Sequence, residues 1–216
     1  MKRNISTITA LLVLLLIGGT GYTYYSDMVA QEELAQEKAK QEQMMQAKKQ
    51  AEEAALSART KCVEGDSFSI TTLDREGSVG QDIVVKEKGT NAPCKYDSVG
   101  AVFEIKNVDP EYYKYQAANA LVTDLGTGPS GRSIRLYDLT EKKLITEKKY
   151  FDELSLASTT LTYFGEAKQK ADAKNCKDFK TLTKDGGTAV LAIEKMVDLK
   201  TFLVKEGKTT KCISVQ

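Results

Sequence analysis

The chain contains no histidine and no tryptophan, and aromatic residues make up only 7% of its 216 residues. The absence of histidine removes the most common general base, the usual Ser-His and Cys-His nucleophile pairs and nearly every catalytic zinc site. Neither sign of charge is in excess, because 31 Lys and Arg residues balance 30 Asp and Glu residues. A sequence-independent nucleic-acid binder needs a basic face. We therefore expect no nucleic-acid partner and no cofactor, and the composition points away from an enzyme.

One long apolar run is present, and it lies at the N-terminus. Two basic residues precede an uncharged segment at residues 4–26, whose centre is Leu11–Ile17. A retained anchor needs about 20 mostly apolar residues. A cleaved signal peptide needs a shorter apolar stretch followed by small residues, a place that Gly19 and Gly21 suit. Residues 1–26 are predicted to be a signal-anchor transmembrane helix, with a cleaved signal peptide as the alternative.

Both interpretations lead to the same topology. Because the basic residues stand before the apolar run, the start of the chain is expected to stay in the cytoplasm and the remainder to be exported. The localisation that follows is a single-pass membrane protein whose C-terminal domain is extracytoplasmic. After cleavage, the same domain would be secreted or periplasmic.

Residues 27–60 are rich in Ala, Gln, Glu, Lys and Met and contain neither proline nor glycine. These residue types favour a helix, so this segment is predicted to be a charged helical stalk. Alternating three- and four-residue spacing, typical of a coiled coil, relates five of its apolar residues: Met44, Ala47, Ala51, Ala54 and Ala58. Two heptads are fewer than such a coil normally needs. A solvated single helix is therefore favoured, and a homodimer through the stalk is the alternative.

Residues 61–216 have the pattern of a β-rich extracytoplasmic domain, because short runs of Val, Ile, Thr, Tyr and Phe alternate with turn residues. The fold class is therefore mainly β, and a β-sandwich or small β-barrel is the predicted architecture. The expected strands are Phe68–Leu73, Ile83–Lys88, Val102–Asn107, Ala120–Asp124, Ile134–Asp138, Leu144–Tyr150, Ser158–Phe164, Ala189–Lys195, Phe202–Lys205 and Lys211–Val215.

Several local features of this domain are also predicted. Ser133–Phe151 is expected to be a hairpin, and Glu206–Lys208 a turn between the last two strands. Glu111–Asn119 and Ala167–Ala173 are expected to be short helices. The apolar spacing of Val190–Phe202 fits either a helix or two strands.

All four cysteines lie in this domain, at Cys62, Cys94, Cys176 and Cys212. An even number in an exported domain indicates two disulfides. Three pairings are possible, and sequence proximity favours Cys62–Cys94 with Cys176–Cys212. A zinc site is disfavoured because no two cysteines have the close spacing of zinc ligands, so no metal is expected.

Three short motifs are each compatible with a function but are explained more simply. Gly126–Gly131 matches the letters of a dinucleotide-binding loop, yet a strand is predicted to follow it where that loop needs a helix. Leu121–Thr127 resembles the active-site strand of aspartic peptidases, which implies Asp124 as an acid, but Leu125 replaces the usual hydroxyl residue. Ile134–Leu139 resembles one hairpin of a propeller blade and has no second copy.

Two clusters of side chains are candidate contact surfaces. The basic cluster contains Arg132, Arg135, Lys142, Lys143, Lys148 and Lys149, and interleaved acidic residues favour a solvated mixed face. The aromatic cluster contains Tyr112, Tyr113 and Tyr115, for which packing is favoured over anchoring a partner.

The functional hypothesis is a membrane-anchored extracytoplasmic binding or structural module, with a protein or envelope polymer as partner. One alternative is a secreted or periplasmic inhibitor or effector. A carboxylate-dependent hydrolase acting through Asp124, or one that uses a Ser-Lys pair, is less favoured. No catalytic, cofactor-binding or metal-binding residue is assigned.

Overall fold

The computed structural model describes residues 4–89, 94–106, 109–128, 132–184 and 186–215, with side chains from residue 31 onward. The chain divides into two compact units, Met1–Ala55 and Leu56–Gln216. Within the described part, no helix is both long and apolar enough to cross a membrane. The anchor predicted at residues 4–26 lies outside the residues whose side chains are described.

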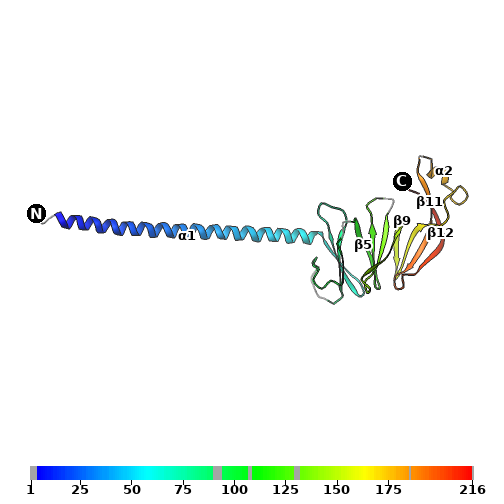
Figure 1. The fold of residues 1–216 in the computed structure, drawn as a ribbon, viewed down its shortest axis with the longest axis horizontal. Helices are drawn as coiled ribbons and strands as arrows, with labels where there is room; N and C mark the ends of the chain where they lie inside the picture. Colours follow the sequence, from blue (N-terminus) through cyan, green and yellow to red (C-terminus); the bar gives the residue numbers. More distant parts are fainter. Residues whose placement is uncertain (1–3, 90–93, 107–108, 129–131, 185, 216) are drawn as a thin grey trace. The chain divides into compact units, whose positions relative to one another are not determined.

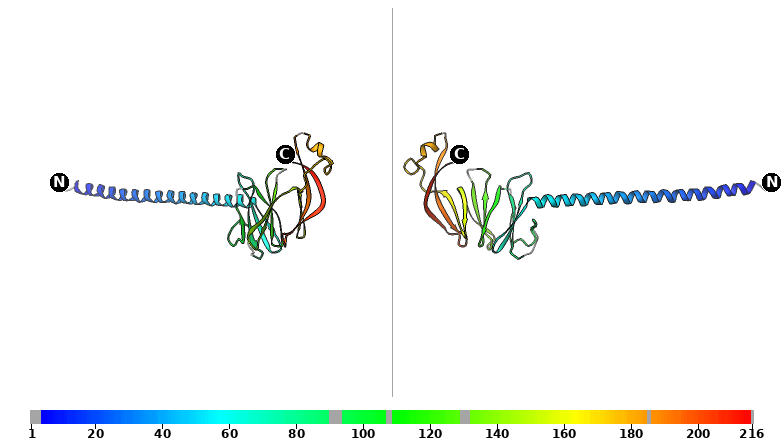
Figure 2. Two further views of the ribbon diagram at one scale, coloured as in Figure 1. Left: turned by 45° about the vertical axis from the view of Figure 1, so that its right-hand side comes forward. Right: turned by 180° about the vertical axis from the view of Figure 1, so that it is seen from behind.

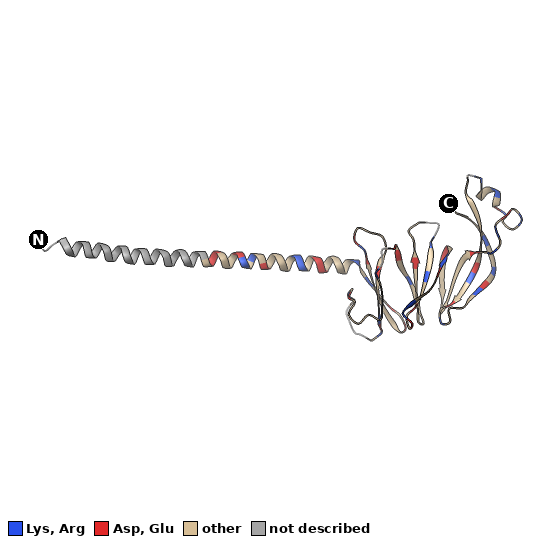
Figure 3. Cartoon of the chain, viewed as in Figure 1, with Lys and Arg blue, Asp and Glu red and all other residues tan. Residues whose placement is uncertain are grey.

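The first unit consists of one helix, α1 (Asn4–Arg59), whose last residues belong to the second unit. Side chains at residues 31–55 are all exposed, including Met44 and Leu34. Figure 3 shows acidic and basic residues alternating along this part of α1. Such a helix forms through the propensity of its Ala, Glu, Gln and Lys residues, since its side chains bury no face within the chain.

The second unit contains three antiparallel four-stranded sheets, each built from four strands that are consecutive in the sequence (Figure 1). The first sheet contains β1 (Thr60–Glu64), β2 (Phe68–Asp74), β3 (Gln81–Glu87) and β4 (Phe103–Ile105). The central sheet contains β5 (Glu111–Ala117), β6 (Ala120–Leu125), β7 (Ser133–Asp138) and β8 (Lys143–Lys149). The third sheet contains β9 (Phe151–Ala157), β10 (Thr160–Glu166), β11 (Thr188–Asp198) and β12 (Val204–Val215), and α2 (Phe179–Leu182) lies between β10 and β11.

The central sheet is buried on both faces, as Figures 1 and 2 show by its place between the other two sheets. Along β6, Ala120 and Val122 pack in the core shared with the third sheet, while Leu121 packs in the core shared with the first sheet. Successive side chains of a strand point to opposite faces, so one strand supplies both cores. β7 does the same, with Leu136 in one core and Tyr137 in the other.

The mainly β fold is thus confirmed at the level of its class, but the architecture has three sheet layers where a two-layer sandwich or a barrel was predicted. The difference follows from β6 and β7, whose successive side chains are buried in two different cores, so that both faces of these strands are covered. Each predicted strand after Cys62 overlaps an observed one, although Phe202–Lys205 and Lys211–Val215 belong to the single strand β12. β7 and β8 form the predicted hairpin. β1, β5 and β9 were not predicted.

Three local predictions are wrong. Residues 111–117 of the expected short helix form β5, because Glu111 and Ala117 are buried against neighbouring strands. Residues 167–173 contain no helix. The expected turn at Glu206–Lys208 lies within β12 at a bulge, since Lys195 pairs with Glu206 and Ile193 pairs with Thr210. The ambiguous segment after residue 190 continues β11 as one strand.

The two disulfides have the favoured connectivity and attach loops to the two outer sheets. Cys62–Cys94 joins β1 to the loop before β4, and Cys176–Cys212 joins the segment between β10 and β11 to β12. Near the first bridge, Lys86 Nζ of β3 donates to Asp97 Oδ2 at 3.3 Å. Each bridge therefore restrains a segment that has no strand pairing of its own.

Removing either disulfide by paired Cys→Ser substitution is expected to lower the free energy of unfolding by about 3–4 kcal/mol. The two effects should be similar, because the bridged residues are 32 and 36 positions apart. Urea unfolding followed by near-ultraviolet circular dichroism measures both values. An unchanged unfolding midpoint in either double variant would contradict the expectation.

Candidate functional site

Asp124, the one residue that sequence analysis raised as a candidate acid, is completely buried near the end of β6. Its carboxylate accepts hydrogen bonds from Arg132 Nε at 3.0 Å and from the Tyr150 hydroxyl at 2.9 Å, both at Oδ1. Arg132 Nη2 contacts Oδ2, and Lys114 Nζ lies 3.6 Å from the same oxygen. The carboxylate is thus held by two cations and a phenol.

The partners of Asp124 come from different parts of the central sheet and its edge. Lys114 is the extra residue at a bulge in β5, where the pairing with β6 shifts between Tyr113 and Tyr115. A bulge redirects a side chain, and here it brings the ammonium group to a carboxylate on the neighbouring strand. Tyr150 is the single residue between β8 and β9, so its bond to Asp124 fixes the crossing to the third sheet.

An open recess of about 410 Å³ lies over this cluster, with Tyr112, Lys114, Arg132 and Thr127 in its lining. Burial lowers the pKa of Lys114, and the nearby Arg132 guanidinium lowers it further. An aspartic-peptidase dyad requires two carboxylates that share a proton. The described partners of Asp124 carry positive charge or a hydroxyl group, which is the arrangement of a structural ion pair.

A second buried carboxylate, Glu111 at the start of β5, was not noticed in the sequence. Its Oε1 accepts hydrogen bonds from Thr123 Oγ1 at 2.5 Å and from the Tyr137 hydroxyl at 2.6 Å. Its Oε2 accepts from Arg135 Nη1 at 2.8 Å. In the sequence, Glu111 follows Pro110 directly and precedes an apolar and aromatic stretch. This pattern indicates the start of a strand more readily than it indicates a buried charge.

The candidate basic and aromatic surfaces are engaged within the fold in part, since Lys142, Lys148 and Lys149 stay exposed and form no ion pair among the described residues. Arg135 pairs with Glu147 and Asp109 as well as with Glu111. Of the tyrosines in the cluster at residues 112–115, the Tyr112 hydroxyl accepts from Gly80 N at 3.0 Å and the Tyr115 hydroxyl donates to Leu154 O at 3.0 Å. These bonds connect the central sheet to both outer sheets.

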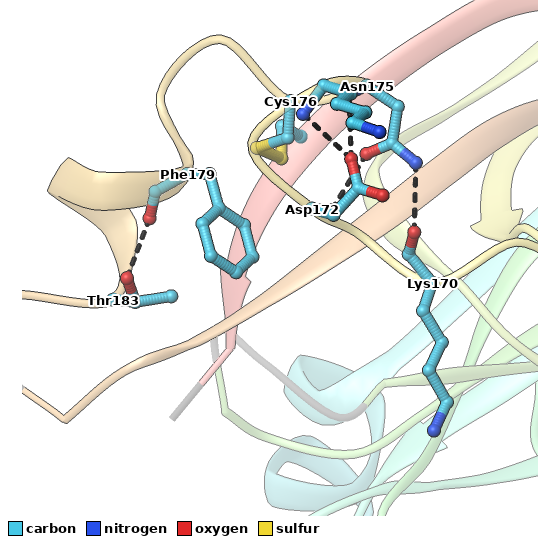
Figure 4. Close-up of a disulfide and its surroundings, with 8 residues drawn as sticks. Lys170, Asp172, Asn175, Cys176, Phe179 and Thr183 are labelled. Atoms are coloured by element: carbon cyan, nitrogen blue, oxygen red, sulfur yellow. Dashed lines mark hydrogen bonds between the residues drawn. A yellow bond between two sulfur atoms is a disulfide. The ribbon is translucent and has the colours of Figure 1, made fainter.

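A larger recess, of about 550 Å³, lies beside the segment between β10 and β11. We call residues 167–187 the insertion. Its backbone is held by Cys176–Cys212 and by Asp172, whose Oδ1 accepts from Lys174 N at 2.8 Å and from Asn175 N at 3.0 Å. Figure 4 shows this loop beside the disulfide, with Phe179 on the adjoining turn and the Lys170 side chain extending away from the loop.

The insertion has a different charge balance from the rest of the chain. Residues 167–187 contain three acidic residues and six lysines, and every one of these lysines is exposed: Lys168, Lys170, Lys174, Lys177, Lys180 and Lys184. Among the described residues, none of the six forms an ion pair, a property that they share with exposed lysines elsewhere in the unit, such as Lys148 and Lys149. The near-neutral composition concealed this local excess, because charge elsewhere in the chain balances it.

The remaining motifs add no site. Gly126–Gly131 joins β6 to β7, so a strand follows the glycines as expected, and residues 129–131 lie outside the described ranges. In the described parts of the chain, no cluster of His, Cys, Asp and Glu side chains could hold a metal ion. Comparison with protein-family models, with curated proteins and with solved structures gave no match. The two recesses are therefore the candidate sites that the geometry offers.

Replacing Asp124 with Asn should destabilise the second unit, because Arg132 and Lys114 would lose their counter-charge in a buried site. Because the Arg132 and Lys114 side chains are about one third exposed and remain hydrated, we expect the free energy of unfolding to fall by about 1–3 kcal/mol. Asp66→Asn, at an exposed residue, is the matched control and should change it by less than about 0.5 kcal/mol. Equal stability of the two variants in urea would show that the buried ion pair contributes nothing.

Alkaline pH should destabilise the fold partly through Tyr137. Burial raises the pKa of its phenol, and the hydrogen bond to Glu111 raises it further. The folded state therefore keeps a proton that the unfolded chain loses, so stability falls as the pH rises above about 10. In Tyr137→Phe this dependence should be shallower between pH 9 and pH 11 when urea unfolding is measured. A slope equal to that of the parent protein would contradict the assignment.

Proposed function

We propose that the chain is a membrane-anchored extracytoplasmic binding or structural module. In this proposal residues 4–26 form the anchor, residues 27–60 a helical stalk, and residues 61–216 the domain presented to a partner. The observation that carries it is the pair of disulfides on the two outer sheets. Disulfides persist in oxidising compartments, and the apolar N-terminal run offers a route of export to one.

The arrangement of buried charge supports binding over catalysis. Asp124 contacts two cations and a tyrosine, and Glu111 contacts Arg135, Tyr137 and Thr123. Both carboxylates thereby have roles in holding strands together. A hydrolase that uses Asp124 would have to release it from the Arg132 pair before the carboxylate could transfer a proton.

The exposure of the helix supports its role as a spacer. Side chains at residues 31–55 of α1 contact no core of the chain, and Lys48 and Glu52 form an exposed i,i+4 pair at 3.9 Å. A solvated helix of this kind holds a domain away from the bilayer at about 1.5 Å per residue. The residues with alternating three- and four-residue spacing, which include Ala47 and Ala51, could pair with the same residues of a second chain. A dimer through this segment is therefore the alternative oligomeric form.

The main alternative is a secreted or periplasmic inhibitor or effector. It shares the disulfides and the β-rich domain with the leading proposal and differs only in the removal of the N-terminal segment. The intact mass of the native protein therefore separates the two.

We expect the native protein to sediment with membranes, to resist carbonate extraction and to have the mass of all 216 residues, 23.8 kDa. Because both bridges should be oxidised, the four cysteines should alkylate only after reduction. Mass spectrometry with and without reductant measures both properties in one sample.

Each other outcome has a definite meaning. A soluble protein whose mass corresponds to a chain beginning near Tyr22 would favour the secreted form over the membrane-anchored form. Cysteines that alkylate without reduction in the native protein would overturn the extracytoplasmic location for both forms.

A further inference from the structure

The third sheet has an unpaired strand edge inside the larger recess. β10 ends at Glu166, which pairs with Ala192 of β11, and the last backbone bond between the two segments runs from Ala167 N to Leu191 O at 2.9 Å. β11 begins earlier, at Thr188. Its first three residues therefore extend past the end of β10.

One of these residues directs its backbone groups into the recess. The N–H and C=O groups of a strand residue point to one side, and this side alternates along the strand. Leu191 O points toward the insertion, so the N–H and C=O of Ala189 point the same way. In the described part of the chain, Ala189 is paired only with Ser214 of β12, on the opposite side.

The walls of the recess combine apolar and cationic groups. Phe179, Val190 and Leu191 contribute apolar surface, and Lys168 and Lys170 lie on its lining from the insertion. Both lysines are exposed, and within the described residues neither forms an ion pair. Glu166 also lines the recess, so its two ammonium groups outnumber one carboxylate. The site thus offers backbone hydrogen-bonding groups, an apolar wall and positive charge together.

We propose that this recess binds a short, extended, acidic peptide segment of a partner protein, which adds as a strand beside Thr188–Val190. Strand addition uses main-chain hydrogen bonds for affinity and side-chain contacts for specificity. Glutamate or aspartate side chains of the segment complement Lys168 and Lys170 on the lining, and Thr188–Val190 match about 10 Å of extended chain. This inference rests on the proposed binding function and names its partner chemistry.

The Cys176–Cys212 bridge gives the site its shape. It anchors the insertion to β12 at Cys176, while Ala167–Ala171 and Phe179 of the same insertion line the recess. The recess is therefore preformed, which lowers the entropic cost of binding.

The test uses the full chain in detergent micelles and two fluorescent six-residue peptides, one of alternating Glu and Val and one of alternating Lys and Val. Fluorescence anisotropy at physiological salt measures binding, and hydrogen exchange of the backbone at residues 186–191 locates it. We expect saturable binding of the acidic peptide, slower exchange at these residues, and at least about tenfold weaker binding of the basic peptide. Equal binding of the two peptides, or none of the acidic one, would overturn the proposal.

Two charge-reversed double variants distinguish binding at the recess from non-specific electrostatic attraction to the protein. Lys168→Glu with Lys170→Glu should weaken binding by about tenfold or more. Lys205→Glu with Lys208→Glu, at exposed positions of β12, changes the net charge equally and should weaken it by less than about threefold, because salt screens charges beyond about 8 Å. Equal losses in both would mean non-specific attraction and overturn the site.

Ala189→Pro tests the strand edge itself. Proline removes the N–H that points into the recess, and it leaves the bonds between β11 and β12 intact because Ala189 makes none of them. Binding should fall by about tenfold with the unfolding midpoint little changed. Unchanged affinity would overturn strand addition, and a dimer that dissociates in this variant would assign the recess to a second copy of the chain.

A failure here is distinguishable from a failure of the proposed function. Peptide binding does not depend on residues 4–26, whereas the mass and alkylation results do not depend on the recess. If the acidic peptide does not bind but the mass and alkylation results are as expected, the membrane-anchored module stands and its partner binds at another surface.

Discussion

Burial of the central sheet on both faces is the constraint on which the rest of the domain depends. β6 and β7 supply alternate side chains to two separate cores, and within the described residues neither outer sheet packs on a further layer of strands. Apolar burial is worth about 25 cal/mol for each Å² removed from water. Damage to the central sheet therefore weakens both interfaces at once, while damage to an outer sheet affects one.

The two buried carboxylates belong to the same arrangement. Tyr112 and Asp124 are a cross-strand pair of β5 and β6, and Glu111 is the neighbouring residue on β5. Asp124 shares a face with Val122 and is bonded to Tyr150 at the crossing to the third sheet, while Glu111 is bonded to Tyr137 on the face toward the first. A buried charge is tolerated only with full pairing. Each cluster therefore fixes the register of the central sheet at one end, on one face.

The outer sheets carry the features suited to binding because each keeps one face free of the central core. Each also carries a loop attached by a disulfide, and the one on the third sheet leaves β11 partly unpaired. Natural proteins usually protect such edges with charge or cover them. Here, among the described residues, the insertion bonds to the edge through Ala167. In the proposal, its lysines discourage pairing with another lysine-rich copy and favour an acidic strand.

Most strands could be predicted from the sequence because β-branched and aromatic runs between turn residues determine them locally, and the disulfide pairs followed from proximity along the chain. β5 was mistaken for a helix because Glu, Lys and Gln occur among its tyrosines, and only pairing with β6 makes it a strand. The role of Asp124 depended on Lys114, Arg132 and Tyr150, which strand register and a bulge bring together. The recess arises because the last bond from the β10 side reaches Leu191 whereas β11 begins at Thr188, a mismatch between two strands that are separated by 21 residues of the chain. Local propensity therefore determined the elements, whereas their packing decided which charges are buried and which edge is open.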